Sequence, residues 1–254
     1  MNKSRNSKDC RDLDTVSFLF NELLFRPIFN ILVFLYDVIP GNDFGVAIII
    51  LTILIKLIFF PLTAKSLVAQ RKLSELQPKV KELQEKYKND RQKLGAETMA
   101  LYKQHQINPL SGCFPILIQL PVLFALFKAL NIVFEPESLD FVYGFISNPG
   151  AIKETSFYFL NLSVNNPTLA ITAGVLQYFQ IKVSNTNRPK QGDAVQDPTQ
   201  KSLNQMTKQM LYFFPIMIII IAWNFPTGLV LYWVVTTGLS IVEQKIINKK
   251  HFSN

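Results

Sequence analysis

The stretch from Phe44 to Leu62 reads FGVAIIILTILIKLIFFPL, and it decides the fold of this chain. Its 19 residues are long enough for a helix that crosses a bilayer, and they carry one charge, Lys56. Fourteen of them are Leu, Ile, Val or Phe. At about −0.3 to −0.6 kcal/mol each, these outweigh about +3 kcal/mol for the lysine, so the segment is predicted to insert. An ionisable group at that depth is costly and by default indicates a functional site.

The composition extends the membrane interpretation to the whole chain. Its 254 residues are 49% hydrophobic, with a formal charge of +8. A basic soluble protein would suggest nucleic acid as a partner. Here the charges flank apolar segments, which is typical of cytoplasmic loops beside anionic lipid headgroups, so direct reading of nucleic acid is not expected. The two cysteines, Cys10 and Cys113, are far apart and form neither a disulfide framework nor a CxxC metal site.

The apolar runs predict an all-α membrane protein with five transmembrane helices. A polar, mobile N-terminus (1–26) is expected to precede a core (27–248) and a short tail (249–254). Within the core, the expected transmembrane helices are 43–63, 112–134, 167–183, 207–223 and 227–247, joined by a charged segment (64–106), a mixed segment (135–166) and a polar loop (184–206). One helix over 207–247 would be about 60 Å long, twice the hydrocarbon thickness, so the break at 224–228 is expected to be a turn.

Residues 27–39 allow two interpretations. Apolar residues recur at helical spacing after Pro27, which predicts an amphipathic helix on the membrane surface. The alternative is a first transmembrane helix across 16–39. Glu22, Arg26 and Asp37 interrupt that run and favour the surface helix.

The charged segment 64–106 is predicted to form an antiparallel helical hairpin. Its apolar positions are spaced alternately by four and three residues, which is the pattern of a coiled-coil seam. The first seam comprises Ala69, Leu73, Leu76, Val80, Leu83 and Tyr87, and the second comprises Leu94, Thr98, Leu101 and His105. The first helix, of about 23 residues, should project about 35 Å and bend at Pro78.

The distribution of basic residues predicts the topology. The loops 64–111 and 182–208 carry ten and five Lys or Arg residues and the C-terminal end 245–254 carries three, whereas 135–166 carries one and 224–228 none. The positive-inside rule places the first three in the cytoplasm and the other two outside. The N-terminus is then expected outside and the C-terminus in the cytoplasm, although five basic residues in 1–26 oppose this locally.

Polar residues of four helices fall at similar depth in the inner half of the bilayer. Lys56, Gln119 and Thr236 lie about 10–13 Å from the inner boundary, Thr52 lies one turn from Lys56, and Gln177 and Gln180 lie nearer the inner end of 167–183. A hydrated cavity open to the cytoplasm would satisfy all of them. Equally, Lys56 could extend to the interface while the Gln and Thr residues bond to neighbouring helices. Spacing alone leaves these alternatives even.

No catalytic pattern accompanies these polar residues. The sequence has two histidines, His105 and His251, both in expected cytoplasmic segments, and no HExxH, GxSxG or P-loop. Apart from Asp43 at the outer end of 43–63, the first four expected transmembrane helices lack Asp and Glu, whereas a cation-coupled transporter usually needs a buried carboxylate. An enzyme, a cofactor and a metal site are therefore not expected.

Several strings resemble one known family. NPLSGCFPILIQLPVLFALF (108–127), FPTGLVLYW (225–233), LQPKVKELQEKY (76–87) and FGVAIIILTILIKLIFFPLT (44–63) occur in the order found in YidC-type membrane protein insertases. The resemblance covers 27–248 nearly end to end. It implies five core helices, a cytoplasmic helical hairpin and a surface helix on the outer face. The large periplasmic domain of many Gram-negative members is absent, as expected for a short form, and the basic C-terminal tail is short.

The resemblance also implies a function and a site. Such proteins insert and help to fold other membrane proteins in the bacterial inner membrane, through a groove that is open to cytoplasm and lipid. A positive residue, usually arginine, lies in that groove, and Lys56 occupies its position here. The substrate-groove residues implied are Lys56, Thr52, Gln119, Gln180, Trp233 and Tyr232. Nascent membrane proteins are the expected clients, and the Sec translocon, the ribosome and the signal recognition particle pathway are expected partners of the hairpin.

Two other classes remain as competing hypotheses. A small channel or transporter should carry matching polar groups in both halves of the bilayer. A purely structural assembly factor should tolerate neutral substitution of Lys56.

Overall fold

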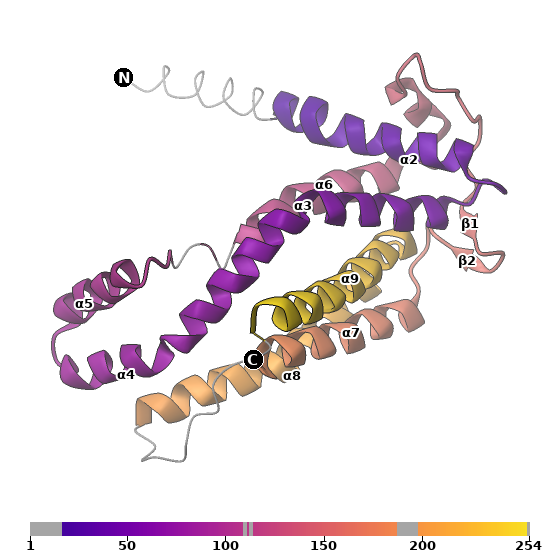
Figure 1. Cartoon of the computed structure of the whole chain (residues 1–254). Helices are drawn as coiled ribbons and strands as arrows, with labels where there is room; N and C mark the ends of the chain where they lie inside the picture. Colours follow the sequence, from indigo (N-terminus) through magenta and orange to yellow (C-terminus); the bar gives the residue numbers. More distant parts are fainter. Residues whose placement is uncertain (1–16, 109–110, 112–113, 187–197, 253–254) are drawn as a thin grey trace, which may run out of the picture. The chain divides into compact units, whose positions relative to one another are not determined.

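The chain folds almost entirely into helices (Figure 1). The computed structural model describes residues 17–108, 111, 114–186 and 198–252. Residues 1–16 of the expected mobile N-terminus, 109–110 and 112–113 of the turn before the 112–134 helix, 187–197 of the polar loop, and 253–254 of the tail lie outside the described residues. The contacts divide the chain into two compact units. The first comprises Met1–Lys56, Ile118–Ala173 and Ile218–Thr236, and the second comprises Leu57–Leu117, Gly174–Met217 and Thr237–Asn254.

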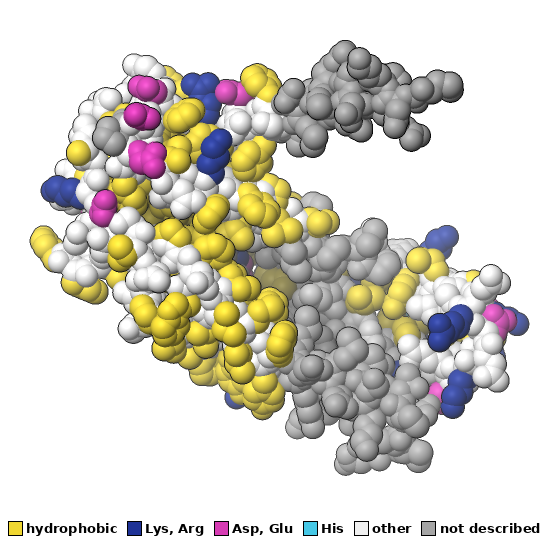
Figure 2. Space-filling view, turned by 180° about the vertical axis from the view of Figure 1, so that it is seen from behind, with side chains coloured by type: hydrophobic (Ala, Val, Ile, Leu, Met, Phe, Trp, Pro, Cys, Tyr) yellow, Lys and Arg dark blue, Asp and Glu magenta, His cyan; other side chains and the backbone are white. Residues whose placement is uncertain are grey.

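Among the described residues, three helices are long and apolar enough to cross a membrane: Ser17–Val38, Phe44–Glu75 and Thr227–Lys250. Two shorter apolar helices, Leu117–Ile132 and Leu211–Trp223, accompany them. The large hydrophobic side chains left exposed, such as Leu57, Ile58 and Phe124, are those that lipid would cover. Figure 2 shows such side chains over much of one face, and Lys, Arg, Asp and Glu around the charged hairpin. The fold is that of a helical membrane protein.

The N-terminal helix is longer than the surface helix expected at 27–39. Helical residues begin at Ser17, pass through a π-helical turn, η1 (Asn21–Phe25), and continue as α2 (Arg26–Val38). Arg26 does not interrupt the helix, because its Nη1 pairs with Glu22 Oε2 one turn earlier at 2.9 Å. One face of α2 is buried, and the other exposes Ile31 and Phe34. Glu22 and Arg26 therefore offset each other within the helix, whereas Asp37 is exposed near its end.

The helix that carries Lys56 does not end near residue 63. α3 runs from Phe44 to Glu75 without a break, about 48 Å at 1.5 Å per residue. Pro61 lies inside it, and no further Pro or Gly occurs before its end. Pro78, expected to bend the first hairpin helix, instead lies in the first turn of a new one, α4 (Gln77–Lys86), where a missing N–H costs nothing.

The charged segment contains two helices that lie side by side (Figure 1). α4 is followed by α5 (Arg91–Gln104), whose N-cap Asp90 accepts a hydrogen bond from Lys93 N–H at 3.0 Å. Leu76 and Val80, two of the seam positions, are buried. Lys79 Nζ lies 3.2 Å from His105 Nε2 between the two helices. With ten residues, α4 is shorter than the 23-residue helix expected, because the first part of that helix belongs to α3.

Four more helices follow in the part of the chain that the structure describes. They are α6 (Phe114–Ile132), α7 (Pro167–Thr186), α8 (Pro198–Trp223) and α9 (Thr227–Phe252). α8 begins within the expected 184–206 loop, and it is separated from α9 by a short turn, as their combined length required. In the first unit, α2, α3, α6 and α9 bury one apolar cluster that includes Phe29, Ile48, Leu126 and Leu229. Gly228 lets α9 pack closely there, since a Cβ would lie 3.3 Å from Leu130 and 3.4 Å from Ile48.

Within the first unit, hydrogen bonds from buried polar residues hold the 135–166 segment against α2 and α9. The segment contains a 3₁₀ helix, η3 (Pro136–Phe141), and two short antiparallel strands, β1 (Thr155–Ser156) and β2 (Leu160–Asn161). The side-chain amide of Asn30, in α2, donates to Phe141 O at 3.0 Å and accepts from Tyr143 N–H at 2.6 Å. Thr227, the first residue of α9, donates its N–H and its hydroxyl to Val164 O. The segment is therefore fixed by side chains that cannot reach water.

Asp43 makes a second attachment of this kind before α3. Its carboxylate accepts hydrogen bonds from the Ser156 hydroxyl and from Phe157 N–H, the latter at 2.7 Å. Burial alone would raise the pKa of Asp43, but hydrogen bonds from Ser156, Phe157, Val46 and Gly45 outweigh burial and hold the pKa below 3.8. Phe157 and Tyr158 both have positive φ, at 51° and 66°. The turn that brings Phe157 N–H to Asp43 is thus a strained one for two aromatic residues.

Candidate functional site

Thr52 and Lys56 lie one turn apart on the same face of α3. Thr52 is buried, and its hydroxyl donates to Ile48 O of the same helix at 2.6 Å. Such a bond satisfies the hydroxyl without a partner helix. Lys56 is half-buried, and the next two residues, Leu57 and Ile58, are exposed. The lysine therefore lies beside an apolar face of the helix that carries it.

Gln119 and Tyr232 are in direct contact. The side-chain N–H of Gln119, in α6, donates to the hydroxyl oxygen of Tyr232, in α9. Tyr232 is 2% exposed and belongs to the apolar cluster of the first unit. Trp233 follows it and is half-buried. The structure thus brings together two of the six expected residues, from helices that are more than a hundred positions apart in sequence.

Gln180 belongs to the second unit. In α7 its side-chain oxygen accepts from the side-chain amide of Gln177 at 3.0 Å, and Gln177 is buried. The five other expected residues, Thr52, Lys56, Gln119, Tyr232 and Trp233, belong to the first unit.

The six residues offer a charge and hydrogen-bonding groups. Lys56 offers a positive charge, and Gln119, Tyr232 and Gln180 offer amides and a hydroxyl. Within the described ranges, no three His, Cys, Asp or Glu side chains gather as a possible metal site.

The sequence interpretation overlooked Lys128, which lies four residues before the end of α6. Its Nζ donates to Asn21 Oδ1 at 2.8 Å and lies 4.3 Å from the centroid of the Phe25 ring. Both partners belong to η1. The signal was available, because Lys128 is the one charged residue between Phe114 and Ile132. Its partners could not be predicted from the sequence, because Asn21 and Phe25 reach Lys128 only through the tertiary fold.

Comparisons with known proteins agree with this arrangement. The family described as 60Kd inner membrane protein matches residues 34–254. The membrane protein insertase YidC of Fusobacterium nucleatum is 36% identical over 235 residues, covering 92% of this chain and 99% of that protein. The YidC of Treponema denticola is 38% identical over 220 residues, covering 84% of this chain and 35% of the relative.

A solved structure shows the same fold. It is described as an active YidC insertase crystal structure with the first transmembrane domain resolved. It aligns with a TM-score of 0.52 at 21% identity, over 82% of this chain and 42% of that one. This chain thus spans nearly all of the Fusobacterium relative but about a third of the Treponema one. The expected resemblance is confirmed. With its apolar helices, the chain is a multi-pass inner-membrane protein, and it belongs to the 60Kd inner membrane protein family, that of the YidC membrane protein insertases.

Proposed function

We propose that this chain is a membrane protein insertase and chaperone, acting on nascent membrane proteins. The observation that carries the proposal is the match to the Fusobacterium insertase, which extends over 92% of one chain and 99% of the other. A match of that extent leaves no separate domain of the relative to supply the activity. No ATP site is needed, since the apolar segment of a client gains free energy as it enters lipid.

We infer that Lys56 acts in a hydrated groove open to the cytoplasm and to lipid. Moving a polar segment through about 30 Å of hydrocarbon is opposed by desolvation, and water in the inner half of the bilayer would shorten that path. Lys56 would attract acidic residues of the client, and low-dielectric walls would strengthen the attraction. Lysine keeps the charge of the family's usual arginine but lacks its planar fork, so the attraction is Coulombic rather than bidentate.

The other expected residues divide into two roles in this proposal. Trp233 and Gln180 would line the groove. Thr52, Gln119 and Tyr232 are bonded within the protein, so they would position the walls rather than bind the client.

The surroundings of the groove follow from the charge pattern. The C-terminus and the α4–α5 pair would lie in the cytoplasm, where the pair would dock the Sec translocon, the ribosome or the signal recognition particle pathway. The N-terminus would lie outside, with helix Ser17–Val38 on the outer face. We likewise propose that the chain crosses the membrane with five helices.

The charge of Lys56 provides the test. Lys56→Arg should keep activity, Lys56→Ala should lose most insertion of a client with an acidic translocated segment, and Lys56→Glu should be worst because it repels that segment. Insertion is measured in a strain depleted of its own insertase. Lys65→Ala, in the same helix but exposed, is the matched control.

A second measurement reports on water. A cysteine at position 56 should react with a charged thiol reagent added from the cytoplasmic side. If Lys56 only extends to the interface, Lys56→Ala should be neutral or stabilising, because it removes about +3 kcal/mol of insertion cost. Full activity of the alanine variant, or no labelling from the cytoplasmic side, would show that Lys56 does not act as a charge in a hydrated groove. Substrate-dependent flux in liposomes would instead indicate a channel or transporter.

A further inference from the structure

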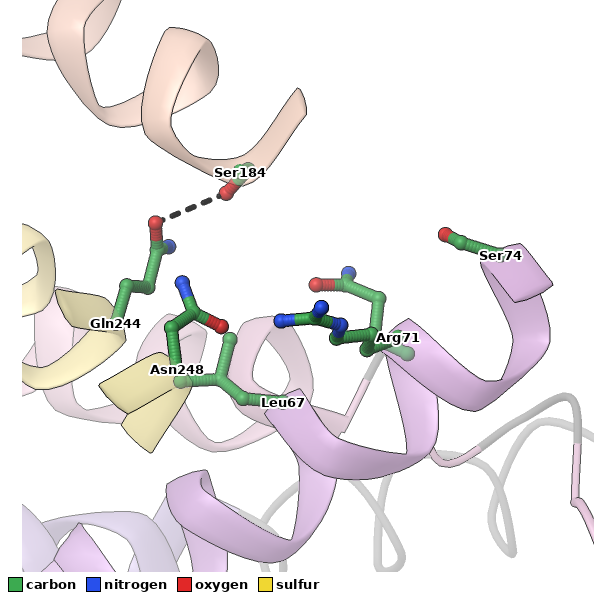
Figure 3. Close-up of a pocket in the computed structure, with 7 residues that line it drawn as sticks. Leu67, Arg71, Ser74, Ser184, Gln244 and Asn248 are labelled. Carbon is green, nitrogen blue, oxygen red and sulfur yellow. Dashed lines mark hydrogen bonds between the residues drawn. The ribbon is translucent and has the colours of Figure 1, made fainter. Parts of the chain in front are cut away.

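The second unit contains a pocket that the proposed groove does not use. It is lined by Leu67, Gln70, Arg71 and Ser74 of α3, Ser184 of α7, and Gln244 and Asn248 of α9. Figure 3 shows Arg71 reaching toward Asn248, with Ser184 and Gln244 joined by a hydrogen bond at the opposite side. That bond runs from Ser184 Oγ to Gln244 Oε1 at 3.0 Å. Three helices thus direct polar side chains into one space.

The lining has an unusual balance of groups. Six of the seven residues carry N–H or O–H donors, one of them, Arg71, is cationic, and none of the described lining residues is acidic. A pocket that presents donors from several directions around a guanidinium matches a tetrahedral anion.

Arg71 has a neighbouring carboxylate, but a weakly coupled one. Its Nε lies 3.5 Å from Glu75 Oε1, and the Glu75 side chain is 49% exposed, whereas that of Arg71 is 22% exposed. Water therefore screens the carboxylate more than it screens the guanidinium. Glu75 therefore offsets the charge of Arg71 only in part.

The position of the pocket in the sequence places it at a membrane boundary. Ser184 follows the apolar residues Ile181 and Val183 at the end of α7. Asn248 follows Ile246 and Ile247 in α9, and Lys249 and Lys250 come directly after it. The pocket's hydrogen-bond donors therefore lie where an apolar segment is followed by basic residues. In a membrane protein this is the depth of the phosphate headgroups.

We propose that this pocket binds a phosphate group, with Arg71 as the principal contact and Ser74 and Asn248 as further donors. The phosphate belongs either to an anionic lipid of the adjacent leaflet or to a free anion. A bound lipid would join the inner ends of α3 and α9, and it would make the second unit sensitive to lipid composition. The proposal does not depend on Lys56 or on insertase activity.

The experiment is native mass spectrometry of the full-length chain in detergent. One arm titrates phosphatidylglycerol and the other inorganic phosphate. Arg71→Gln should weaken binding about tenfold or more, because a hydrogen bond to a charged group contributes about 1.5–3 kcal/mol. Arg91→Gln, in α5 and exposed, makes the same change of charge and should leave binding unchanged.

A second pair of variants tests the pocket without removing the arginine. Ser74→Asp places a carboxylate in the lining and should weaken binding as strongly as Arg71→Gln. Ser74→Asn, whose side chain has nearly the shape of aspartate but no charge, should not. Loss confined to the lipid arm identifies a headgroup, and loss in the phosphate arm identifies a free anion. If Arg71→Gln and Ser74→Asp bind both probes as the wild type does, the proposal is wrong. Unchanged gel filtration of each variant shows that the fold is retained.

Discussion

At the scale of single residues, Asn30 and Thr227 of the first unit are buried polar side chains bonded to backbone groups. Asn30 bonds to Arg26 O, Phe141 O and Tyr143 N–H, and Thr227 bonds to Val164 O. In lipid each such group would cost several kcal/mol if left without a partner. These bonds attach the 135–166 segment to particular helices. Substitution of a single side chain can therefore test the fold.

Lys128 is one such test. Lys128→Met should release η1, because it removes the bond to Asn21 and the contact with the Phe25 ring. Hydrogen exchange at 17–25 should accelerate about tenfold, since a hydrogen bond to a charged group contributes about 1.5 kcal/mol or more. Lys153→Met, which alters an exposed side chain of the 135–166 segment, is the control. Equal protection in both variants would show that Lys128 does not hold the helix.

Asp43 predicts a pH dependence. Because its folded pKa is held below the ordinary 3.8, the carboxylate stabilises the fold above pH 3.8, and this contribution is lost as the pH falls through the folded pKa. Asp43→Asn should therefore lower the melting temperature at pH 7, and the difference from wild type should shrink below about pH 4. Asp140→Asn, which changes an exposed side chain, should show neither effect. A difference that stays constant from pH 7 to pH 3 would contradict the role of the charge.

At the scale of elements, close packing between α3 and the β1–β2 turn depends on one glycine. A Cβ at Gly45 would lie 2.1 Å from Ser156 Oγ and 2.9 Å from Ser156 Cβ. Gly45→Ala should destabilise the fold by about 1–3 kcal/mol, as overpacking does. Ser156→Gly should recover part of the loss when it is combined with Gly45→Ala.

Gly95 is the matched control for this prediction. It lies in α5, and a Cβ there would meet nothing within 4 Å. Gly95→Ala should stabilise the helix by about 0.5–1 kcal/mol. Thermal unfolding in detergent measures both variants. A neutral Gly45→Ala would mean that the turn moves aside freely.

At the scale of the whole molecule, the short helices predict a thinned membrane. The apolar part of α8, Leu211–Trp223, has 13 residues, about 20 Å, against about 30 Å of hydrocarbon. Short spans are accommodated by local thinning at modest cost, and thinning would shorten the path of a client. Spin labels along 208–243 should report a narrow apolar zone. An apolar zone of full thickness would refute the thinning.

Much of this architecture could be predicted from the sequence, because it depends on local signals. Apolar runs, proline positions and charge asymmetry are read within one segment, and they indicated a helical membrane protein. The continuation of α3 to Glu75 was missed because a switch from apolar to charged residues resembles a boundary, although the backbone has no reason to stop there. The contacts of Gln119 with Tyr232 and of Lys128 with Asn21 join residues about 110 positions apart. No periodicity encodes such a pair.

The division of the chain into three separated stretches in each unit also bears on how the protein is made. Phe29 and Leu229 share one buried cluster, so that cluster stays open until almost all of the 254 residues have left the ribosome. Until then Asn30 and Asp43 lack their hydrogen-bond partners at 141–143 and 156–157, which are translated more than a hundred residues later. The earliest helices therefore enter the membrane as incomplete intermediates with unsatisfied polar groups. A protein proposed to shelter such intermediates for others passes through the same stage during its own biosynthesis.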